Sequence, residues 1–309
     1  MKRMLLFSIV LLVAVVALYY TQRKHNSTAV SANPILELAA NAQRDLTRAP
    51  MRLTRLPDSE EIAIGNELAE RYSLSDTNLT SEQQAFEAYV RRVGGNLALH
   101  AHRRLPYSFH LVPDKTMINA FSLPGGPVFI GEGLLDLMTT EDQLAAVLGH
   151  ELEHIDHYHS AERVQIEARL RNLQLGAIGT LVQIPLEVWE VGYSKDEELE
   201  ADREGMRLAV LAGYSPYGAV SMFEKFAKLH DEYVIHAQTP EQELSELAVQ
   251  SLEGYFRSHP QSSERLAQAN ALIAQEGWQD RKAQKPFHVE YEVHSDLRTR
   301  THLARRRDS

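Results

Sequence analysis

The chain has 309 residues, of which 44% are hydrophobic and 24% charged, as is typical of a folded globular protein rather than a disordered one. Its net charge of −10 argues against general nucleic-acid binding, which needs clustered basic side chains. Because the chain has no cysteine, disulfides, a cysteine nucleophile, thiolate metal ligands and a lipid-modified cysteine are excluded.

Residues 1–24 are predicted to form an N-terminal membrane anchor. An apolar run over residues 4–20 is flanked by basic residues on both sides, and it is long enough for a single transmembrane helix. The alternative is a cleaved signal peptide, whose best cleavage site, Val30-x-Ala32, lies well beyond the apolar run. That distance favours an uncleaved anchor. The flanking charges do not orient the anchor, because both sides are basic.

Residues 25–50 are interpreted as a tether, and residues 51–285 as the folded domain. The domain begins with two predicted amphipathic helices, in residues 56–72 and 81–101. Residues 286–309 are predicted to be a solvated basic tail, since Arg298, Arg300 and Arg305 to Arg307 gather there.

Three short strands are expected after these helices. Tyr107, Phe109 and Leu111 alternate with polar residues, which is typical of a half-buried strand. Residues 118–123 and 127–130 form two further strand-like runs around a Pro-Gly-Gly turn. From Gly133 to about residue 280 the pattern is helical, and the apolar stretch 173–189 is interpreted as a core helix because it contains polar residues and a proline. The predicted fold class is therefore α+β, mainly helical with one small β-sheet.

A helix that starts near Glu141 carries the sequence HELEH. Thr140 and Gln143 have the spacing of a capping box, and the preceding turns are apolar, so this helix is expected to be buried. His150 and His154 lie one turn apart on one face and can bind the same metal ion, with Glu151 beside them as a catalytic base. His157 lies a turn too far along the helix to join both histidines, and His159 is predicted to point to the opposite face.

A catalytic zinc site needs a third protein ligand besides these two histidines. The best candidate lies on a second helix, predicted over residues 198–212 between a capping box at Ser194 and a stop at Gly213. Glu198 and Asp202 share one face of that helix. Glu198 is expected to complete the site and Asp202 to orient a histidine, while the alternative is an ordinary acidic helix surface.

His259 precedes Pro260 at the predicted start of a later helix. Proline suits the first turn of a helix, so the residue pattern alone favours a capping or surface histidine.

Four motifs, in order along residues 55–275, resemble one family of enzymes. They are Asn119-Ala120-Phe121 with Leu123-Pro124-Gly125-Gly126, HELEH at 150–154, ELEAD at 198–202, and His259-Pro260 followed by Arg265. This order resembles the gluzincin-type zinc metallopeptidases that include HtpX, the CAAX prenyl protease and the periplasmic BepA/LoiP-like proteases. Many relatives have a basic residue where this chain has Tyr158, and the multiple membrane helices of HtpX and the long repeat domain of BepA are missing.

The resemblance implies roles for individual residues. It implies one Zn²⁺ per chain, bound by His150, His154 and Glu198, with Glu151 as base and Asp202 oriented toward a ligand. Arg265 is expected to stabilise the oxyanion. The strand at Asn119, Ala120 and Phe121 is expected to pair with an extended substrate. His259 is expected on a loop over the site, as a fourth ligand that keeps the resting enzyme closed.

The predicted function is zinc-dependent endoproteolysis of unfolded or misfolded proteins at the membrane, in protein quality control. The expected partners are protein substrates and the membrane, through residues 4–20, without nucleic acid. The expected location is a bacterial inner membrane with the domain in the periplasm, or a soluble periplasmic form after signal cleavage. The alternative function is a zinc-bearing chaperone or adaptor with little cleavage; the Glu151 base argues against it, because a pure binder has no use for one.

Overall fold

The computed structural model describes residues 55–73, 79–170, 193–236, 259 and 263–287. The chain divides into two compact units, Met1–Thr54 and Arg55–Ser309, and all described residues belong to the second unit. The expected anchor, the tether, the stretch 173–189 and the tail after residue 287 lie outside the described residues. Within the described residues, no helix has the length and apolar character needed to cross a membrane.

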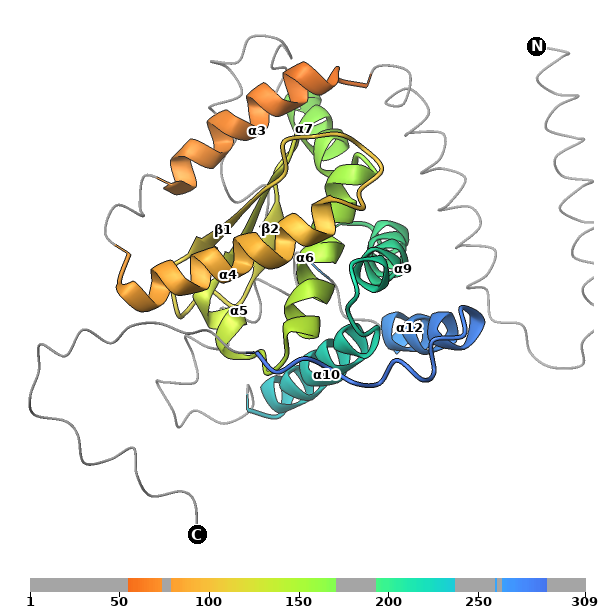
Figure 1. The fold of residues 1–309 in the computed structure, drawn as a ribbon. Coiled ribbons are helices and arrows are strands. Elements are labelled where there is room, and N and C mark those ends of the chain that lie inside the picture. The colour runs from red at the N-terminus through yellow and green to blue at the C-terminus, as the bar shows by residue number, and fades with distance from the viewer. Residues whose placement is uncertain (1–54, 74–78, 171–192, 237–258, 260–262, 288–309) are drawn as a thin grey trace, which may run out of the picture. The chain divides into compact units, whose positions relative to one another are not determined.

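The domain is mainly helical and contains one three-stranded sheet (Figure 1), as expected. The two helices before the sheet are α3 (Asp58–Ser73) and α4 (Ser81–Ala98), and the strands are β1 (Ser108–Val112), β2 (Ala120–Ser122) and β3 (Pro127–Gly131). The later helices are α5 (Glu132–Asp136), α6 (Glu141–Asp156), α7 (His159–Leu170), α9 (Lys195–Leu211), α10 (Tyr217–His236) and α12 (Ser263–Gln275).

The order of the described strands is β1-β3-β2, so β2 is an edge strand among them. β1 runs parallel to β3, and β2 runs antiparallel to it, with Ala120 opposite Ile130 and Phe121 opposite Phe129. Phe109 and Leu111 of β1 are buried while its other residues are half-buried, which confirms the alternation predicted for that strand. The expected turn between β2 and β3 contains Gly125 and Gly126, both with positive φ, a conformation that favours glycine.

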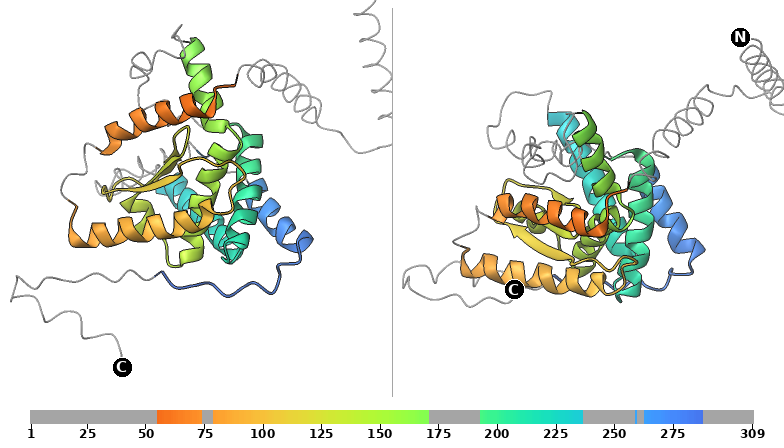
Figure 2. Two further views of the ribbon diagram at one scale, coloured as in Figure 1. Left: turned by 45° about the horizontal axis from the view of Figure 1, so that its top comes forward. Right: turned by 90° about the horizontal axis from the view of Figure 1, so that it is seen from above.

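Helix α6 is the central element of the domain. Its residues from Glu141 to Asp156 are buried except for Ala146, and it contacts both β2 and β3 of the sheet. Figures 1 and 2 show α9 alongside α6; α10 also packs on α6, and α12 packs on α9 and α10. The main core lies between α4, the sheet and α6, and it is filled by residues such as Val93, Leu111 and Leu148.

Both predicted capping boxes are present. The side chain of Thr140 accepts from Gln143 N, and Gln143 Oε1 accepts from Thr140 N, so α6 begins at Glu141. Ser194 and Glu197 make the equivalent pair at the start of α9. Next to the start of α6, Phe287 packs on Tyr89 and donates its N–H to Thr139 O. These contacts hold Phe287, which follows the expected domain end at residue 285, against the folded part of the chain.

Candidate active site

His150 and His154 lie together on the buried face of α6, as the spacing predicts. Their Nε2 atoms are 3.0 Å apart, and the two side chains are buried. Burial lowers the pKa of His154 well below its ordinary value, so its imidazole is neutral. Neutral imidazoles are the form of histidine that binds a metal ion.

Helix α9 brings Glu198 to these histidines. Its Oε2 lies 3.6 Å from His150 Nε2, and its Oε1 lies 3.5 Å from His154 Nε2. Helices α6 and α9 approach each other closely because Gly149 of α6 faces Gly205 of α9. A Cβ on Gly205 would lie 2.8 Å from the backbone N of His150. Although burial opposes ionisation, His259 and Arg265 hold the pKa of Glu198 well below its usual value. Glu198 is therefore a carboxylate.

His259 is buried in the same cluster, from a distant part of the sequence. Its Nδ1 lies 3.1 Å from Glu198 Oε1 and 3.3 Å from His150 Nε2. Its Nε2 lies 3.2 Å from Glu151 Oε1. Although burial opposes protonation, the carboxylates of Glu198 and Glu151 raise the pKa of His259 to about 10. A buried position among ligands differs from the surface or capping histidine that the residue pattern alone favours.

The four side chains form a group that could hold a metal ion. One nitrogen or oxygen from each of His150, His154, Glu198 and His259 lies within 4.8 Å of the others. Glu151, the expected base, is 1% exposed and adjoins this group. Among the described residues, no donor forms a hydrogen bond with the buried Oε2 of Glu151. This oxygen is therefore an unsatisfied hydrogen-bond acceptor.

Asp202 and Arg265 support the cluster from one side. Asp202 Oδ1 lies 2.9 Å from His150 Nδ1, the arrangement expected of a carboxylate that orients a ligand. Arg265 donates from Nε and Nη2 to Asp202, each at 2.6 Å, and its Nη1 lies 3.0 Å from Glu198 Oε2. The guanidinium thus faces two carboxylates, which indicates that it positions them; its expected contact with an oxyanion stays a prediction.

The expected position of His159 was wrong. Its Nδ1 lies 2.9 Å from His154 Nδ1, and its Nε2 lies 3.3 Å from Glu200 Oε2. The prediction assumed one continuous helix, but α6 ends at Asp156 and a new helix, α7, begins at His159. Tyr158 has φ +64° between them, a rare conformation for a non-glycine residue that redirects the chain. A hydrogen bond from His159 also lowers the pKa of Glu200 to about 2.

Tyr193 is another residue of the site that sequence reasoning missed. Its ring stacks on His154 with centroids 3.6 Å apart and an interplanar angle of 11°. The guanidinium of Arg163 lies 3.7 Å from the centroid of the Tyr193 ring, and the hydroxyl lies 3.2 Å from Ser160 Oγ. In the sequence, the one feature that could have drawn attention to Tyr193 is its position directly before the capping box of α9.

The expected substrate strand, β2, borders the metal-ligand group. Ala120 O lies 3.4 Å from His259 Nε2, and Ala120 N donates to the side chain of Asn119 at 2.9 Å. By contrast, Asn119 O accepts from Gly131 N, and the Phe121 ring stacks on Phe129 at 5.1 Å. Of the three predicted residues, Ala120 therefore presents its backbone to the site.

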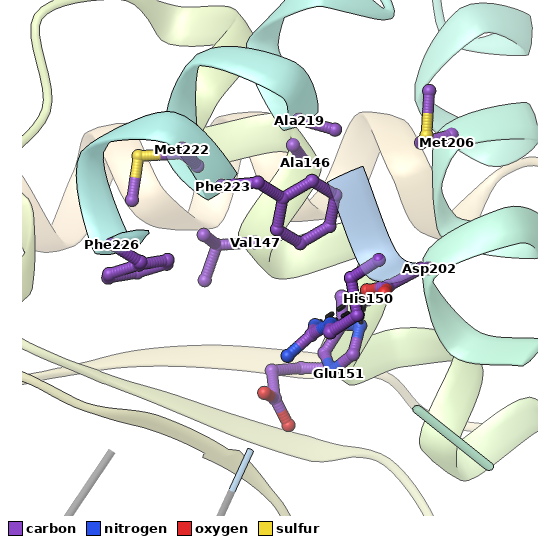
Figure 3. A pocket seen from close by; sticks show the side chains of 11 residues that line it. Ala146, Val147, His150, Glu151, Asp202, Met206, Ala219, Met222, Phe223 and Phe226 are labelled. Carbon is purple, nitrogen blue, oxygen red and sulfur yellow. Dashed lines mark hydrogen bonds and ion pairs between the residues drawn. The ribbon is translucent and has the colours of Figure 1, made fainter. Parts of the chain in front are cut away.

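A pocket adjoins His150 on the side of α10 (Figure 3). It encloses about 380 Å³, counting the space open to solvent. Figure 3 shows apolar side chains from α6 and α10 at one end, and His150, Glu151 and Asp202 at the other. The apolar lining consists of Ala146, Val147, Met206, Ala219, Met222, Phe223 and Phe226.

Comparisons with known proteins find similar peptidases. A model of peptidase family M48 matches residues 81–273. Mitochondrial metalloendopeptidase OMA1 of Arabidopsis thaliana is 30% identical over 52% of this chain and 31% of its own length. A putative beta-barrel assembly-enhancing protease of Vibrio cholerae is 28% identical over 49% of this chain and 34% of its own. OMA1 of Schizosaccharomyces pombe is 34% identical over 44% of this chain and 43% of its own length. The chain thus spans less than half the length of these curated relatives.

Proposed function

Because the chain belongs to peptidase family M48, we propose that it is a zinc-dependent metalloendopeptidase that cleaves unfolded or misfolded proteins. The observation that carries this proposal is the convergence of His150, His154 and Glu198 from two helices, with the Glu151 carboxylate beside them. Paired imidazoles, one carboxylate and a neighbouring base are the parts that metal-assisted peptide hydrolysis needs.

The spacing of the donor atoms supports zinc. Zinc binds nitrogen and oxygen ligands at about 2.0–2.2 Å in a tetrahedron, whose ligands are then about 3.3–3.6 Å apart. The structure places His150 Nε2 3.0 Å from His154 Nε2, and each of them 3.5–3.6 Å from an oxygen of Glu198. These residues would hold one Zn²⁺, and His259 Nδ1 could act as a fourth donor only after its ring releases the proton that the neighbouring carboxylates favour.

The chain's own residues suit acid–base catalysis at this position. A bound zinc ion supplies Lewis acidity, which polarises a peptide carbonyl and makes water more acidic. Glu151 accepts a proton from the attacking water and returns it to the leaving amine. Asp202 holds the His150 ring through Nδ1, and Arg265 fixes Asp202 in turn. Burial of Glu151 keeps its carboxylate away from bulk solvent.

Two features support extended substrates with apolar side chains. β2 is an edge strand, and an edge strand can bind a peptide through backbone hydrogen bonds. The pocket between α6 and α10 is lined mainly by apolar residues and includes the base Glu151, so it would accept an apolar side chain near the scissile bond. Folded proteins bury such side chains, and unfolded ones expose them.

We also propose that His259 closes the resting enzyme. Its two ring nitrogens contact the ligands, the base Glu151 and the carbonyl of Ala120, which are the three parts that a substrate and its attacking water must reach. A substrate would therefore have to displace His259 before it is cleaved.

The proposed location is the periplasmic side of a bacterial inner membrane, with residues 4–20 as the anchor. The apolar run and its flanking basic residues support this location. Protease added to spheroplasts that express the full chain should digest the domain. Complete protection until the cells are lysed would place the domain in the cytoplasm.

Digestion of casein, an unfolded protein, by the purified full-length chain tests the proposed activity. The zinc-loaded enzyme should cleave casein at sites next to large apolar residues, and a chelator should stop cleavage. Glu151→Gln should keep zinc but lose about 10²–10⁴-fold in rate, because only the base is removed. Equal cleavage by this variant and the wild type would contradict the mechanism, and binding of casein without any cleavage would favour the chaperone alternative.

A further inference from the structure

The ring nitrogen of His154 that faces away from the ligand group has a buried partner. We infer that His159 and Glu200 form a relay that positions His154 as a metal ligand. His154 Nδ1 lies 2.9 Å from His159 Nδ1, and His159 Nε2 lies 3.3 Å from Glu200 Oε2. This inference rests on the proposed metal site, since the relay acts on one of its ligands.

The hydrogen bonds of the relay can run in one consistent direction. If Nε2 of His154 offers its lone pair to a metal, its neutral ring carries the proton on Nδ1. That N–H can donate only if His159 Nδ1 is an acceptor, which places the proton of the His159 ring on Nε2. The Nε2–H of His159 then donates to the Glu200 carboxylate. Every ring nitrogen in the relay has a partner, and Glu200 fixes the tautomer of both rings.

The relay is the counterpart of the support that His150 receives. His150 Nδ1 lies 2.9 Å from Asp202 Oδ1, so the Asp202 carboxylate contacts the His150 ring directly. Three of the acidic residues of α9, Glu198, Glu200 and Asp202, alternate along the chain, and Glu200 points to another side of the helix from the other two. Glu200 therefore reaches His154 through an intervening side chain.

The break between α6 and α7 makes this geometry possible. In an uninterrupted helix, His159 would lie five positions beyond His154 and outside its reach. The positive φ of Tyr158 instead places His159 as the first residue of α7, where it is 4% exposed and within hydrogen-bond distance of His154. The unusual backbone conformation is thus found where the relay needs the chain to turn.

Zinc affinity of the purified full-length chain, measured by competition with a chelator, tests the relay. His159→Leu should weaken zinc binding about 10–100-fold, as is typical when a partner of a ligating histidine is removed. His159→Asn should restore most of the affinity, because its Oδ1 can accept from His154 Nδ1 as the imidazole does. Glu200→Ala should also weaken binding. The visible absorption of the cobalt-substituted protein should change in His159→Leu and Glu200→Ala, since it reports ligand geometry.

Two matched variants control for effects that do not pass through His154. His110→Leu changes a half-buried histidine of β1 that contacts Ser108 and Phe129, and Glu204→Ala removes an acid one turn further along α9. Both should bind zinc nearly as the wild type does. Wild-type affinity in His159→Leu, or an equal loss in His159→Leu and His159→Asn, would overturn the relay alone. Failure of the wild type to bind zinc would overturn the proposed function together with the relay.

Discussion

His259 lies where substrate, water and metal ligands would meet. Its Nδ1 is 3.1 Å from Glu198 and its Nε2 is 3.2 Å from Glu151, so one imidazole contacts both a ligand and the base. A side chain in this position excludes water from the base while it is present. Its removal should open the site without taking away one of the three ligands Glu198, His150 and His154.

His259→Ala should therefore raise the basal rate of casein cleavage. If the open form is a minor state of about 0.1–10% of the molecules, the increase should be about tenfold or more. Bound zinc should change little, because three protein ligands remain. The measurement is the initial cleavage rate together with the metal content of each sample.

His110→Ala is a suitable control for that variant. His110 is a half-buried histidine on β1 that contacts Ser108 and Phe129 and has no part in the ligand group. Its replacement should leave the basal rate unchanged. A His259→Ala enzyme that is slower than the wild type would contradict closure, and would assign His259 to substrate binding instead.

At the residue scale, spacing along a regular helix was a sufficient guide to part of the site. One-turn spacing predicted the pair His150 and His154, and it made Glu198 a candidate that the family resemblance then selected; the structure brings the three together. Spacing did not reveal His159 or Tyr193, because both depend on breaks between elements. No rule of local sequence predicts that Tyr158 adopts a positive φ, since tyrosine rarely does so.

Strand β2 is the element of the sheet that borders the site. Because Asn119 O accepts from Gly131 N, the backbone of Asn119 faces β3, and the backbone of Ala120 faces the opposite edge. Ala120 O and Ala120 N are occupied by His259 and by the Asn119 side chain. These contacts cover the groups that a substrate strand would pair with, so substrate pairing requires both to move.

Ala120→Pro should weaken substrate binding through this edge. Proline has no N–H to donate, and loss of one backbone hydrogen bond should lower kcat/KM about tenfold. Zinc content should stay at the wild-type level, since Ala120 is not a ligand. Ala120→Val is the matched variant, because valine adds a similar bulk but keeps the N–H. If both variants lose activity equally, the defect is steric and β2 is not the edge that pairs with substrate.

At the element scale, the strands and the start of α6 could be predicted because each depends on a few neighbouring residues. Alternation identified β1, and the capping box at Thr140 located the first residue of α6. Helix α9 begins at Lys195, directly after the capping residue Ser194, rather than at the predicted Glu198. The side of β2 that faces the site could not be predicted, because strand pairing decides it. A change of register by one residue would have exposed the backbone of Asn119 instead of Ala120.

At the scale of the whole domain, the site joins segments that are far apart in the sequence. Ala120 comes from the sheet, the two histidines from α6, Glu198 from α9, and His259 from a position shortly before α12. Local patterns could propose members of this group, but only the resemblance to a known family joined His259 to it. The buried carboxylates of Glu151, Glu198 and Asp202 lie in one region of the core, where Arg265 and His259 pair with them. A bound cation would connect α6 to α9 in this region through His150, His154 and Glu198.

Zinc should consequently stabilise the whole domain against heat. A ligand that binds only the folded state at 1,000 times its Kd adds about 4.1 kcal/mol of unfolding free energy. For a domain of this size, 1 kcal/mol corresponds to about 2–4 °C, so zinc should raise the Tm of the purified full-length chain by about 8–16 °C. Calorimetry with zinc and with a chelator measures the difference. Glu198→Ala, which lacks one ligand, should show a much smaller response because its zinc affinity is lower. A wild-type Tm that does not change with zinc, or a full response in Glu198→Ala, would contradict a zinc site that links α6 to α9.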